Sequence, residues 1–300
     1  SRLRAKCRAK LFDVRSKRIW PGRDEKILAS WNGMMISAMS QGAMILDDPK
    51  YAEAASQAAD FILNQMRESD GRLLHSHKYG RARFNGYLDD YVCLIDGLID
   101  LFQATGESNR LASALELAER VVTHFEDTPD GGFFYTSSDH EELITRTKDS
   151  QDNATPSGNG MAAYALLRLG RICSRTDIEE KAVATLEILS GQMAQHALAS
   201  SQSLLAADFF TGPAWELVLV AGKDPASNEE ARRTVNSAFM PNRLIVTADV
   251  STTESPVAAL LHDRLAINDE PTLYICRQGA CQNPVSGLAA IAGAVKELAR

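Results

Sequence analysis

The sequence has 300 residues, of which 45% are hydrophobic and 24% charged, and its formal net charge is −7. This composition is typical of a globular protein, and the length suffices for one large domain or two ordinary ones. The acidic balance argues against nucleic acid or an anionic membrane as a partner. Because no apolar run reaches spanning length and no signal peptide is apparent, we expect a cytoplasmic protein with no membrane contact.

The five cysteines are few and odd in number, which is typical of a reducing compartment. Cys93 and Cys173 lie in apolar helical runs, where we expect buried, inert thiols. The spacing of Cys276 and Cys281 is typical neither of a redox motif nor of half a zinc site. A structural pair and two free thiols are the alternatives for them, and redox activity is a further hypothesis. Because the chain opens with Ser1 rather than Met, we interpret it as a fragment.

The first helices in chain order differ in kind. Residues 2–14 predict a helix with a basic, solvated face, and Trp20-Pro-Gly then ends that segment. The stretch from Asp24 to about Leu46 predicts a helix that is apolar on all sides and therefore interior. Residues 50–66 carry apolar side chains on one face only, which predicts an outer helix.

This pattern of a polar loop, a buried helix and an amphipathic helix occurs two more times. Residues 88–104 predict an inner helix followed by an outer helix over 111–125, and a third inner helix begins near Pro156 and precedes an outer helix over 178–193. The period is roughly 60 to 70 residues. Strict alternation of buried and half-buried helices predicts an inner ring wrapped by an outer ring, with the polar loops at one end.

The C-terminal third has a different character. Short strands are predicted over 216–222, 242–246 and 272–276, with helical segments over 228–237 and 256–261 and a last helix over 285–298. We therefore predict helical hairpins over residues 1–212, a small α/β subdomain over 213–283, and a helix over 284–300 that closes the ring.

Polar side chains gather at the predicted N-terminal ends of the inner helices and in the loops just before them, which we call the mouths of these helices. They are Asp24, Lys26, Trp31 and Asn32, then Asp89, Asp90 and Tyr91, and then Arg146, Lys148, Asp152, Ser157 and Asn159. Asp and Asn bind hydroxyl groups, and Trp and Tyr stack on sugar rings, so this mixture is typical of a polyhydroxylated ligand. Two carboxylates across a cleft are what glycoside hydrolysis requires. We expect Asp90 and Asp152 to be the acid/base pair and the other side chains to bind or orient the substrate.

Structural roles compete with these functional ones. Asp24, Asp89 and Ser157 lie at positions where a side chain can cap the N-terminus of a helix. Lys26, Arg146 and Lys148 could simply form ion pairs with the acids. Adjacent Asp89 and Asp90 point about 100° apart on a helix, so we expect only one to address the pocket. His75 and His77 alternate along a short segment and share a face, but no third ligand is spaced to join them. We predict no metal and no cofactor.

Several stretches carry a resemblance to a known family. They are Asp24-Glu-Lys-Ile-Leu-Ala-Ser-Trp-Asn-Gly, Tyr87-Leu-Asp-Asp-Tyr, Asp130-Gly-Gly-Phe-Phe, Arg146…Asp152…Pro156-Ser-Gly-Asn and the tail Tyr274-Ile-Cys…Cys281-Gln-Asn-Pro-Val. Together they resemble the spermatogenesis-associated protein 20 / YyaL-like family of thioredoxin-domain-containing proteins. One departure is Glu25, where the family usually shows a second Asp.

The resemblance implies a fold and a partner. It implies an upstream thioredoxin-like domain, absent from this chain, followed by an (α/α)6 toroid of the six-hairpin glycosidase and N-acylglucosamine 2-epimerase type. This chain matches the later part, so we expect a mainly α fold: a partial (α/α)6 toroid with a small C-terminal α/β insertion.

Two functions follow from the residues and the resemblance. The first is a carbohydrate-active protein, a glycoside hydrolase or a sugar epimerase/isomerase, that binds a small sugar-like ligand at the inner-helix mouths. The alternative is a non-catalytic binding or scaffolding module that works with the upstream thioredoxin-like domain.

Overall fold

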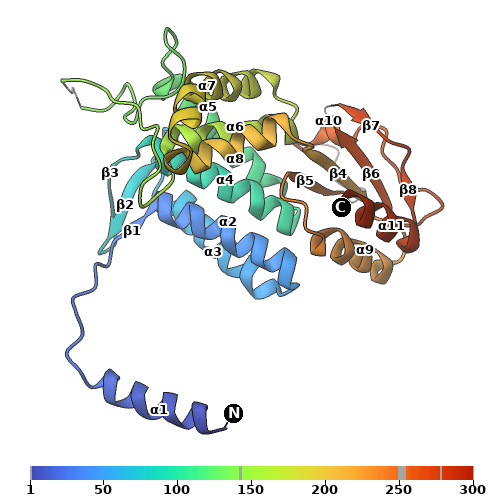
Figure 1. The fold of residues 1–300 in the computed structure, drawn as a ribbon, viewed down its shortest axis with the longest axis horizontal. Helices are drawn as coiled ribbons and strands as arrows, with labels where there is room; N and C mark the ends of the chain where they lie inside the picture. Colours follow the sequence, from blue (N-terminus) through green and yellow to red (C-terminus); the bar gives the residue numbers. More distant parts are fainter. Residues whose placement is uncertain (1, 142–143, 249–254, 278, 300) are drawn as a thin grey trace.

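The computed structural model describes residues 2–141, 144–248, 255–277 and 279–299. Four inner helices lie side by side, and each contacts the next: α2 (Ala29–Leu46), α4 (Leu88–Thr105), α6 (Gly158–Ile172) and α8 (Ser201–Thr211), the last preceded by the 3-10 turn η1 (Ala197–Ser200). Three outer helices cover them: α3 (Pro49–Gln65), α5 (Ser108–Phe125) and α7 (Thr176–Gln195) (Figure 1). The predicted alternation and the mainly α fold class are confirmed. None of the described helices is long and apolar enough to cross a membrane.

The packing of α2 against α4 depends on two glycines. A Cβ atom added at Gly33 would lie 2.5 Å from the backbone carbonyl carbon of Cys93, and one added at Gly97 would lie 2.5 Å from the carbonyl oxygen of Gly33. Real Cβ atoms do not approach backbone atoms this closely, so the two helices touch backbone to backbone. Nearly every residue of α4 is buried as a result of its neighbours on all sides.

The start and the outer side of α2 differ from the prediction. The helix begins at Ala29 rather than near Asp24, because residues 27–28 form the short strand β1 (Ile27–Leu28). One side of α2 is open to solvent, with Trp31 61%, Met35 55% and Ile45 60% exposed. Within the described residues no helix covers that side, and α1 (Arg2–Ser16) lies apart with no buried residue (Figure 1).

A three-stranded antiparallel sheet stands at the N-terminal end of the inner helices (Figure 1). Its order is β1, β2 (Leu74–Lys78) and β3 (Arg81–Asn85). Leu28 pairs with Ser76, which also pairs with Arg83. Because side chains alternate along a strand, Ser76 and Lys78 share one face of β2, and His75 and His77 share the other.

The C-terminal part forms a second sheet with helices beside it. Its elements are β4 (Trp215–Val220), α9 (Pro225–Ser237), β5 (Arg243–Ala248), α10 (Ala258–Leu261), β6 (Thr272–Arg277), β7 (Ala280–Cys281), β8 (Val285–Ser286) and α11 (Leu288–Leu298). The strand order is β5-β4-β6-β7, with β8 also paired to β6. Strand β4 runs parallel to β5 and antiparallel to β6. The predicted small α/β region is confirmed.

This sheet joins two hydrophobic cores. Leu217 and Leu219 pack with α9 and α11 in one core, whereas Val218, on the opposite face of β4, belongs to the core of the helical ring. We expected α11 to close the ring, but its buried residues Ile291 and Val295 pack against the sheet beside α9. The boundaries at residues 212 and 283 stay a prediction.

The glycine contact predicts opposite effects of two substitutions in the same helix. Gly33→Ala should destabilise the fold by about 1–3 kcal/mol, because its methyl group meets the backbone of α4. Gly42→Ala should be neutral or stabilise by about 0.5–1 kcal/mol, because its methyl group would meet only one atom of Tyr51, at 4.0 Å. Urea unfolding of both variants measures the difference, and equal effects would refute the contact.

Candidate functional site

Asp90 joins three elements at the mouth of the ring. Its Oδ1 accepts the backbone N–H of Ser30 at 3.0 Å, and its Oδ2 accepts that of Tyr87 at 3.0 Å. Nδ1 of His75 lies 2.8 Å from Oδ2, and the Asp90 side chain is fully buried. At α2 no side-chain bond comes from the N-cap residue, Leu28, itself. The carboxylate therefore ties the N-termini of α2 and α4 to strand β2.

Asp152 has the corresponding position at the other two inner helices. Its Oδ1 accepts the backbone N–H of Ser157 at 2.9 Å, and its Oδ2 accepts that of Gln202 at 2.8 Å. These residues lie at the starts of α6 and α8. The two aspartates that we predicted as an acid/base pair thus each bridge a pair of inner-helix N-termini. Their catalytic assignment stays a prediction.

Two other predicted binding residues of the third loop also have structural partners. Ser157 is the N-cap of α6, where its hydroxyl accepts the backbone N–H of Gly160 at 3.2 Å. The Asn159 side chain is buried, accepts the N–H of Phe133 at 2.8 Å and donates to the carbonyl of Phe133 at 2.8 Å. It also donates to the Asp149 carbonyl at 2.9 Å. Both side chains hold the loop to the ring.

Arg146 and Lys148, the two cations of the third loop, also contact other groups of the protein. The guanidinium of Arg146 donates to the carbonyls of Thr136 and His124 and lies 4.1 Å from the centre of the Phe134 ring. Burial lowers the pKa of Arg146. Lys148 pairs with the carboxylate of Asp127 at 2.7 Å and donates to the backbone carbonyl of Gly131 at 2.6 Å. The orienting role that we expected for Arg146 therefore competes with its loop contacts.

The first mouth is more exposed than predicted. Asp24 lies in the extended segment before β1, where it pairs with Lys26 at 3.1 Å and Lys78 at 3.2 Å. It caps no helix, because α2 begins later. The amide of Asn32 donates to a backbone carbonyl one turn earlier at 2.8 Å. Trp31 is exposed on the open side of α2.

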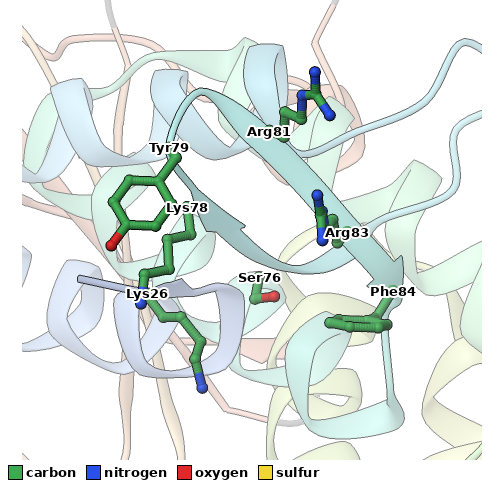
Figure 2. A pocket seen from close by; sticks show the side chains of 7 residues that line it. All are labelled: Lys26, Ser76, Lys78, Tyr79, Arg81, Arg83 and Phe84. Carbon is green, nitrogen blue, oxygen red and sulfur yellow. The ribbon is translucent and has the colours of Figure 1, made fainter. Parts of the chain in front are cut away.

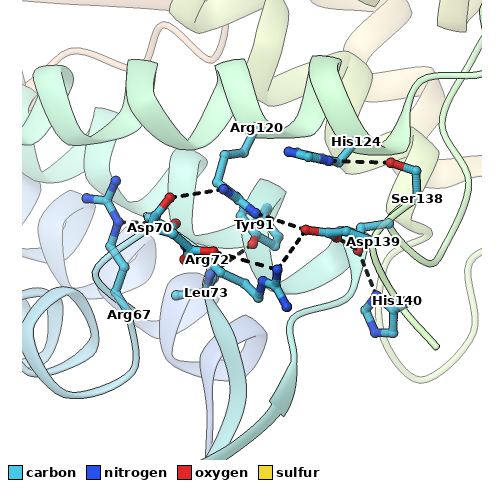
Figure 3. Close-up of polar contacts among 12 residues, drawn as sticks. Arg67, Asp70, Arg72, Leu73, Tyr91, Arg120, His124, Ser138, Asp139 and His140 are labelled. Carbon is cyan, nitrogen blue, oxygen red and sulfur yellow. Dashed lines mark hydrogen bonds and ion pairs between the residues drawn. The ribbon is translucent and has the colours of Figure 1, made fainter.

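Tyr91 lies away from the mouth, contrary to the stacking role that we predicted. Its hydroxyl accepts the backbone N–H of Leu73 at 2.8 Å, and its ring meets Phe125 of α5 edge-on at 5.3 Å. Figure 3 shows it beside the polar network of Arg120 and Asp139. The reason is helical geometry, since successive residues point about 100° apart.

Two tyrosines that the sequence analysis did not assign line the mouth instead. Tyr87 and Tyr135 are stacked, with ring centres 4.8 Å apart, and His75 meets Tyr87 edge-on at 5.1 Å. The backbone N–H of Leu88 donates to the carbonyl of Tyr135, which holds this loop against the start of α4. The available signal was their position, because Tyr87 is the first residue of one family-like stretch and Tyr135 directly follows another. We call His75, Tyr87, Asp89, Asp90 and Tyr135 the mouth cluster.

In this cluster, Asp89 is the carboxyl group with one oxygen that lacks a hydrogen-bond partner among the described residues. Burial and the neighbouring Asp90 charge raise the pKa of Asp89 to about 6. Its buried Oδ1 has no hydrogen-bond partner among the described residues. Burial raises the pKa of Tyr135, and the Asp89 charge adds to that rise. Asp89 therefore keeps one buried oxygen without a partner in the described part of the chain, whereas both oxygens of Asp90 accept backbone N–H groups.

His75 is held in a defined orientation beside this carboxyl group. Its hydrogen bond to Asp90 raises the pKa of the imidazole, burial opposes the rise, and Asp89 contributes to it. Nε2 makes no hydrogen bond with the residues that the structure describes, and about a quarter of the side chain is exposed. An imidazole whose Nδ1 is held by a carboxylate is suited to proton transfer at Nε2.

A cationic cavity of about 520 Å³ lies on the Ser76 face of the three-stranded sheet. It is lined by Lys26, Ser76, Lys78, Tyr79, Arg81, Arg83 and Phe84. Figure 2 shows Tyr79 near the hairpin turn and Phe84 at the other end of β3, with cationic side chains between them. Anionic groups are therefore favoured on this face of the sheet, which is opposite the face that carries His75.

The interior of the ring holds a buried ionic cluster. Arg168 of α6 pairs with Asp96 and Asp100 of α4, and Asp100 also accepts from Ser37 at 2.5 Å and Gln41 at 2.9 Å, both on α2. Burial raises the pKa of Asp96 to about 6, and the Arg168 charge opposes that rise. The cluster ties three inner helices together. In the described part of the chain, no group of three or more His, Cys, Asp or Glu could hold a metal ion.

Comparison with known proteins supports the fold and the resemblance. No protein-family model matches the chain. Spermatogenesis-associated protein 20 of Rattus norvegicus is 30% identical over 289 residues and that of Homo sapiens 29%, and each alignment covers 92% of this chain and 37% of the relative. A GH76 alpha-mannanase of Bacteroides thetaiotaomicron has a similar structure, with a TM-score of 0.51 and 13% identity over 79% of this chain and 68% of the mannanase.

At 13% identity the structural likeness shows the fold alone. The sequence comparison covers nearly all of this chain, which spans 37% of the length of these curated relatives. The chain is thus similar to spermatogenesis-associated protein 20 over that part of its length, and it folds as a partial (α/α)6 toroid.

Proposed function

We propose that the mouth cluster binds a sugar-like ligand and transfers protons to and from it. The observation that carries this proposal is Asp89, a half-buried carboxyl group with an unpaired oxygen and a pKa raised to about 6. Tyr87 stacks against both Tyr135 and His140, so in our proposal the outer face of Tyr135 supplies the flat apolar surface that sugar rings pack on. The structurally similar mannanase acts on a carbohydrate by its name, which supports the same ligand class.

The residue types favour isomerisation or epimerisation over hydrolysis by two carboxylates. Hydrolysis of a glycosidic bond needs two free carboxyl groups that flank it. Both oxygens of Asp90 and both oxygens of Asp152 accept backbone N–H groups, so neither is free. In our proposal His75, fixed by Asp90, takes the proton from the carbon next to the sugar carbonyl, and Asp89 protonates or deprotonates the oxygen. The acid role thereby moves from Asp90 to Asp89.

The cations on the neighbouring sheet set an expectation for the ligand. Four of the residues that line that cavity, Lys26, Lys78, Arg81 and Arg83, are cationic, although Asp24 pairs with two of them. A positive surface on the sheet that also carries His75 favours a ligand with a carboxylate or phosphate. Sugar acids and sugar phosphates therefore belong in a ligand screen beside neutral sugars.

A sugar screen followed by exchange in D2O tests the proposed chemistry. Sugars that raise the melting temperature are incubated with the protein in D2O, and NMR measures deuterium at the carbon next to the carbonyl. We expect exchange with wild-type protein and a loss of about 100-fold or more in Asp89→Asn, because proton transfer by a placed side chain contributes this much. Asp130→Asn, an exposed acid of a rim turn, is the matched control and should leave the rate unchanged.

Other results of the same screen contradict the proposal in different ways. Binding without exchange, unaffected by Asp89→Asn, favours the non-catalytic module, which would work with an upstream thioredoxin-like domain. Release of sugar from glycosides without carbon exchange favours hydrolysis. In that case Asp149, which contributes to the raised pKa of Tyr135, is the second carboxyl group to replace.

The raised pKa of Asp89 also predicts a stability effect with a defined sign. The folded state holds the proton of Asp89 more tightly than the unfolded state does, so the group destabilises the fold as pH rises from about 4 to above 6. Asp89→Asn should therefore stabilise the protein at pH 8 by about 1–3 kcal/mol and leave it unchanged at pH 4. Urea unfolding at the two pH values measures this, and a loss of stability at pH 8 would contradict it.

A further inference from the structure

The two cysteines near the C-terminus, for which alternatives stood open, form a disulfide. Cys276 in β6 lies directly opposite Cys281 in β7, and their sulfur atoms are bonded. Cys276 is buried, whereas Cys281 is exposed. Cys93 and Cys173 are buried free thiols, as expected. A thiol of another molecule therefore reaches the disulfide from the side of Cys281.

A cation is fixed against both sulfur atoms. Nη2 of Arg264 lies 3.2 Å from Sγ of Cys276 and 3.4 Å from Sγ of Cys281. Nη1 of the same guanidinium is buried and has no acceptor among the described residues. A disulfide sulfur is a weak acceptor, whereas a thiolate is charged and pairs strongly with a guanidinium. Reduction would therefore place a thiolate directly against Arg264, which makes no close ion pair with the described residues in the oxidised state.

A carboxyl group faces the buried sulfur from the neighbouring strand. Glu216 of β4 is directly opposite Cys276 on the same face of the sheet, where facing Cβ atoms lie about 4.5–5.5 Å apart. Burial raises the pKa of Glu216, and the charges of Arg171 and Arg264 oppose the rise. Glu216 is thus placed to return a proton to Cys276 once the disulfide opens.

The disulfide contributes less as a cross-link than one that closes a long loop. The two cysteines are five residues apart in sequence, and closing so short a loop removes less entropy from the unfolded chain than closing a long one. Exposed disulfides are also the ones most open to thiol exchange. The disulfide is exposed on one side and has a fixed cation and a carboxyl group beside it. These features suit thiol exchange better than a purely stabilising role.

We propose that the Cys276–Cys281 disulfide is redox-active and oxidises a dithiol partner. A thiolate of the partner attacks Sγ of Cys281, the bond between the two cysteine sulfurs breaks, and Cys276 leaves as a thiolate beside Arg264. The partner's second thiol loses its proton and attacks the partner sulfur of the mixed disulfide, which releases Cys281. The partner ends as a disulfide, and Cys276 and Cys281 gain its two electrons and two protons.

The rate of reduction by dithiothreitol, a small dithiol, tests the role of Arg264. The folded protein is mixed with reductant, quenched by alkylation and mapped by mass spectrometry, which separates this pair from exposed Cys7. Arg264→Gln should slow reduction about tenfold, because the leaving thiolate loses its cation. Arg277→Gln removes a charge on the same strand, from a side chain over Trp215, and should stay within about twofold of wild type.

A second variant protects the test against misfolding. Arg264→Lys keeps the cation and should stay within about threefold of wild type even if Arg264→Gln does not fold. Equal rates for Arg264→Gln and Arg277→Gln, or reduction that requires denaturant, would overturn the proposal. Neither result bears on the sugar site, because that site is tested by carbon exchange.

A monothiol tests the direction of attack. Glutathione cannot complete the second step within one molecule, so quenched samples should carry glutathione on Cys281. Glutathione found on Cys276 would overturn the assignment of Cys281 as the attacked sulfur.

Discussion

The free N–H groups at the starts of the inner helices impose the constraint on which the mouth of this ring depends. The first N–H groups of a helix have no partner within it, and leaving them buried and unpaired costs about 1–3 kcal/mol each. Here one carboxylate serves two helices: Asp90 accepts from α2 and α4, and Asp152 accepts from α6 and α8. Their negative charges also complement the positive ends of the helix dipoles. The mouth is rigid because its helices share caps.

This arrangement explains why two adjacent aspartates have different roles. Asp90 is fully buried and saturated with hydrogen bonds, whereas the neighbouring Asp89 keeps an unpaired oxygen and a raised pKa. The Asp90 charge contributes to that rise, so the structural residue tunes the free one. It also fixes the ring of His75. A single capping group thereby positions the imidazole of His75 and adds to the rise that burial causes in the pKa of the Asp89 carboxyl group.

Features that depend on local periodicity could be predicted from the sequence. Features that depend on a residue far away along the chain could not. The alternation of inner and outer helices could be read from apolar spacing, because burial on one or all faces produces that spacing. The start of α2 could not, because its cap is Asp90, sixty residues away, and not nearby Asp24. Asp152 was chosen for its place in a polar loop, but that same place makes it a shared cap. Tyr91 was assigned to the mouth because sequence position does not show which side of the helix a residue faces.

The two proposed sites lie at opposite ends of one rigid frame. The helix starts form the mouth, and the C-terminal sheet packs at the far end of the ring (Figure 1). The charge of Arg171, near the end of α6, opposes the rise that burial causes in the pKa of Glu216 beside the disulfide. At the start of α6, the backbone N–H of Ser157 donates to Asp152. Between these ends, the pairing of Arg168 with Asp96 and Asp100 fixes α6 to α4. Helix α6 therefore runs from the mouth to the neighbourhood of the disulfide, and the buried ion pairs fix it to α4 between the two sites.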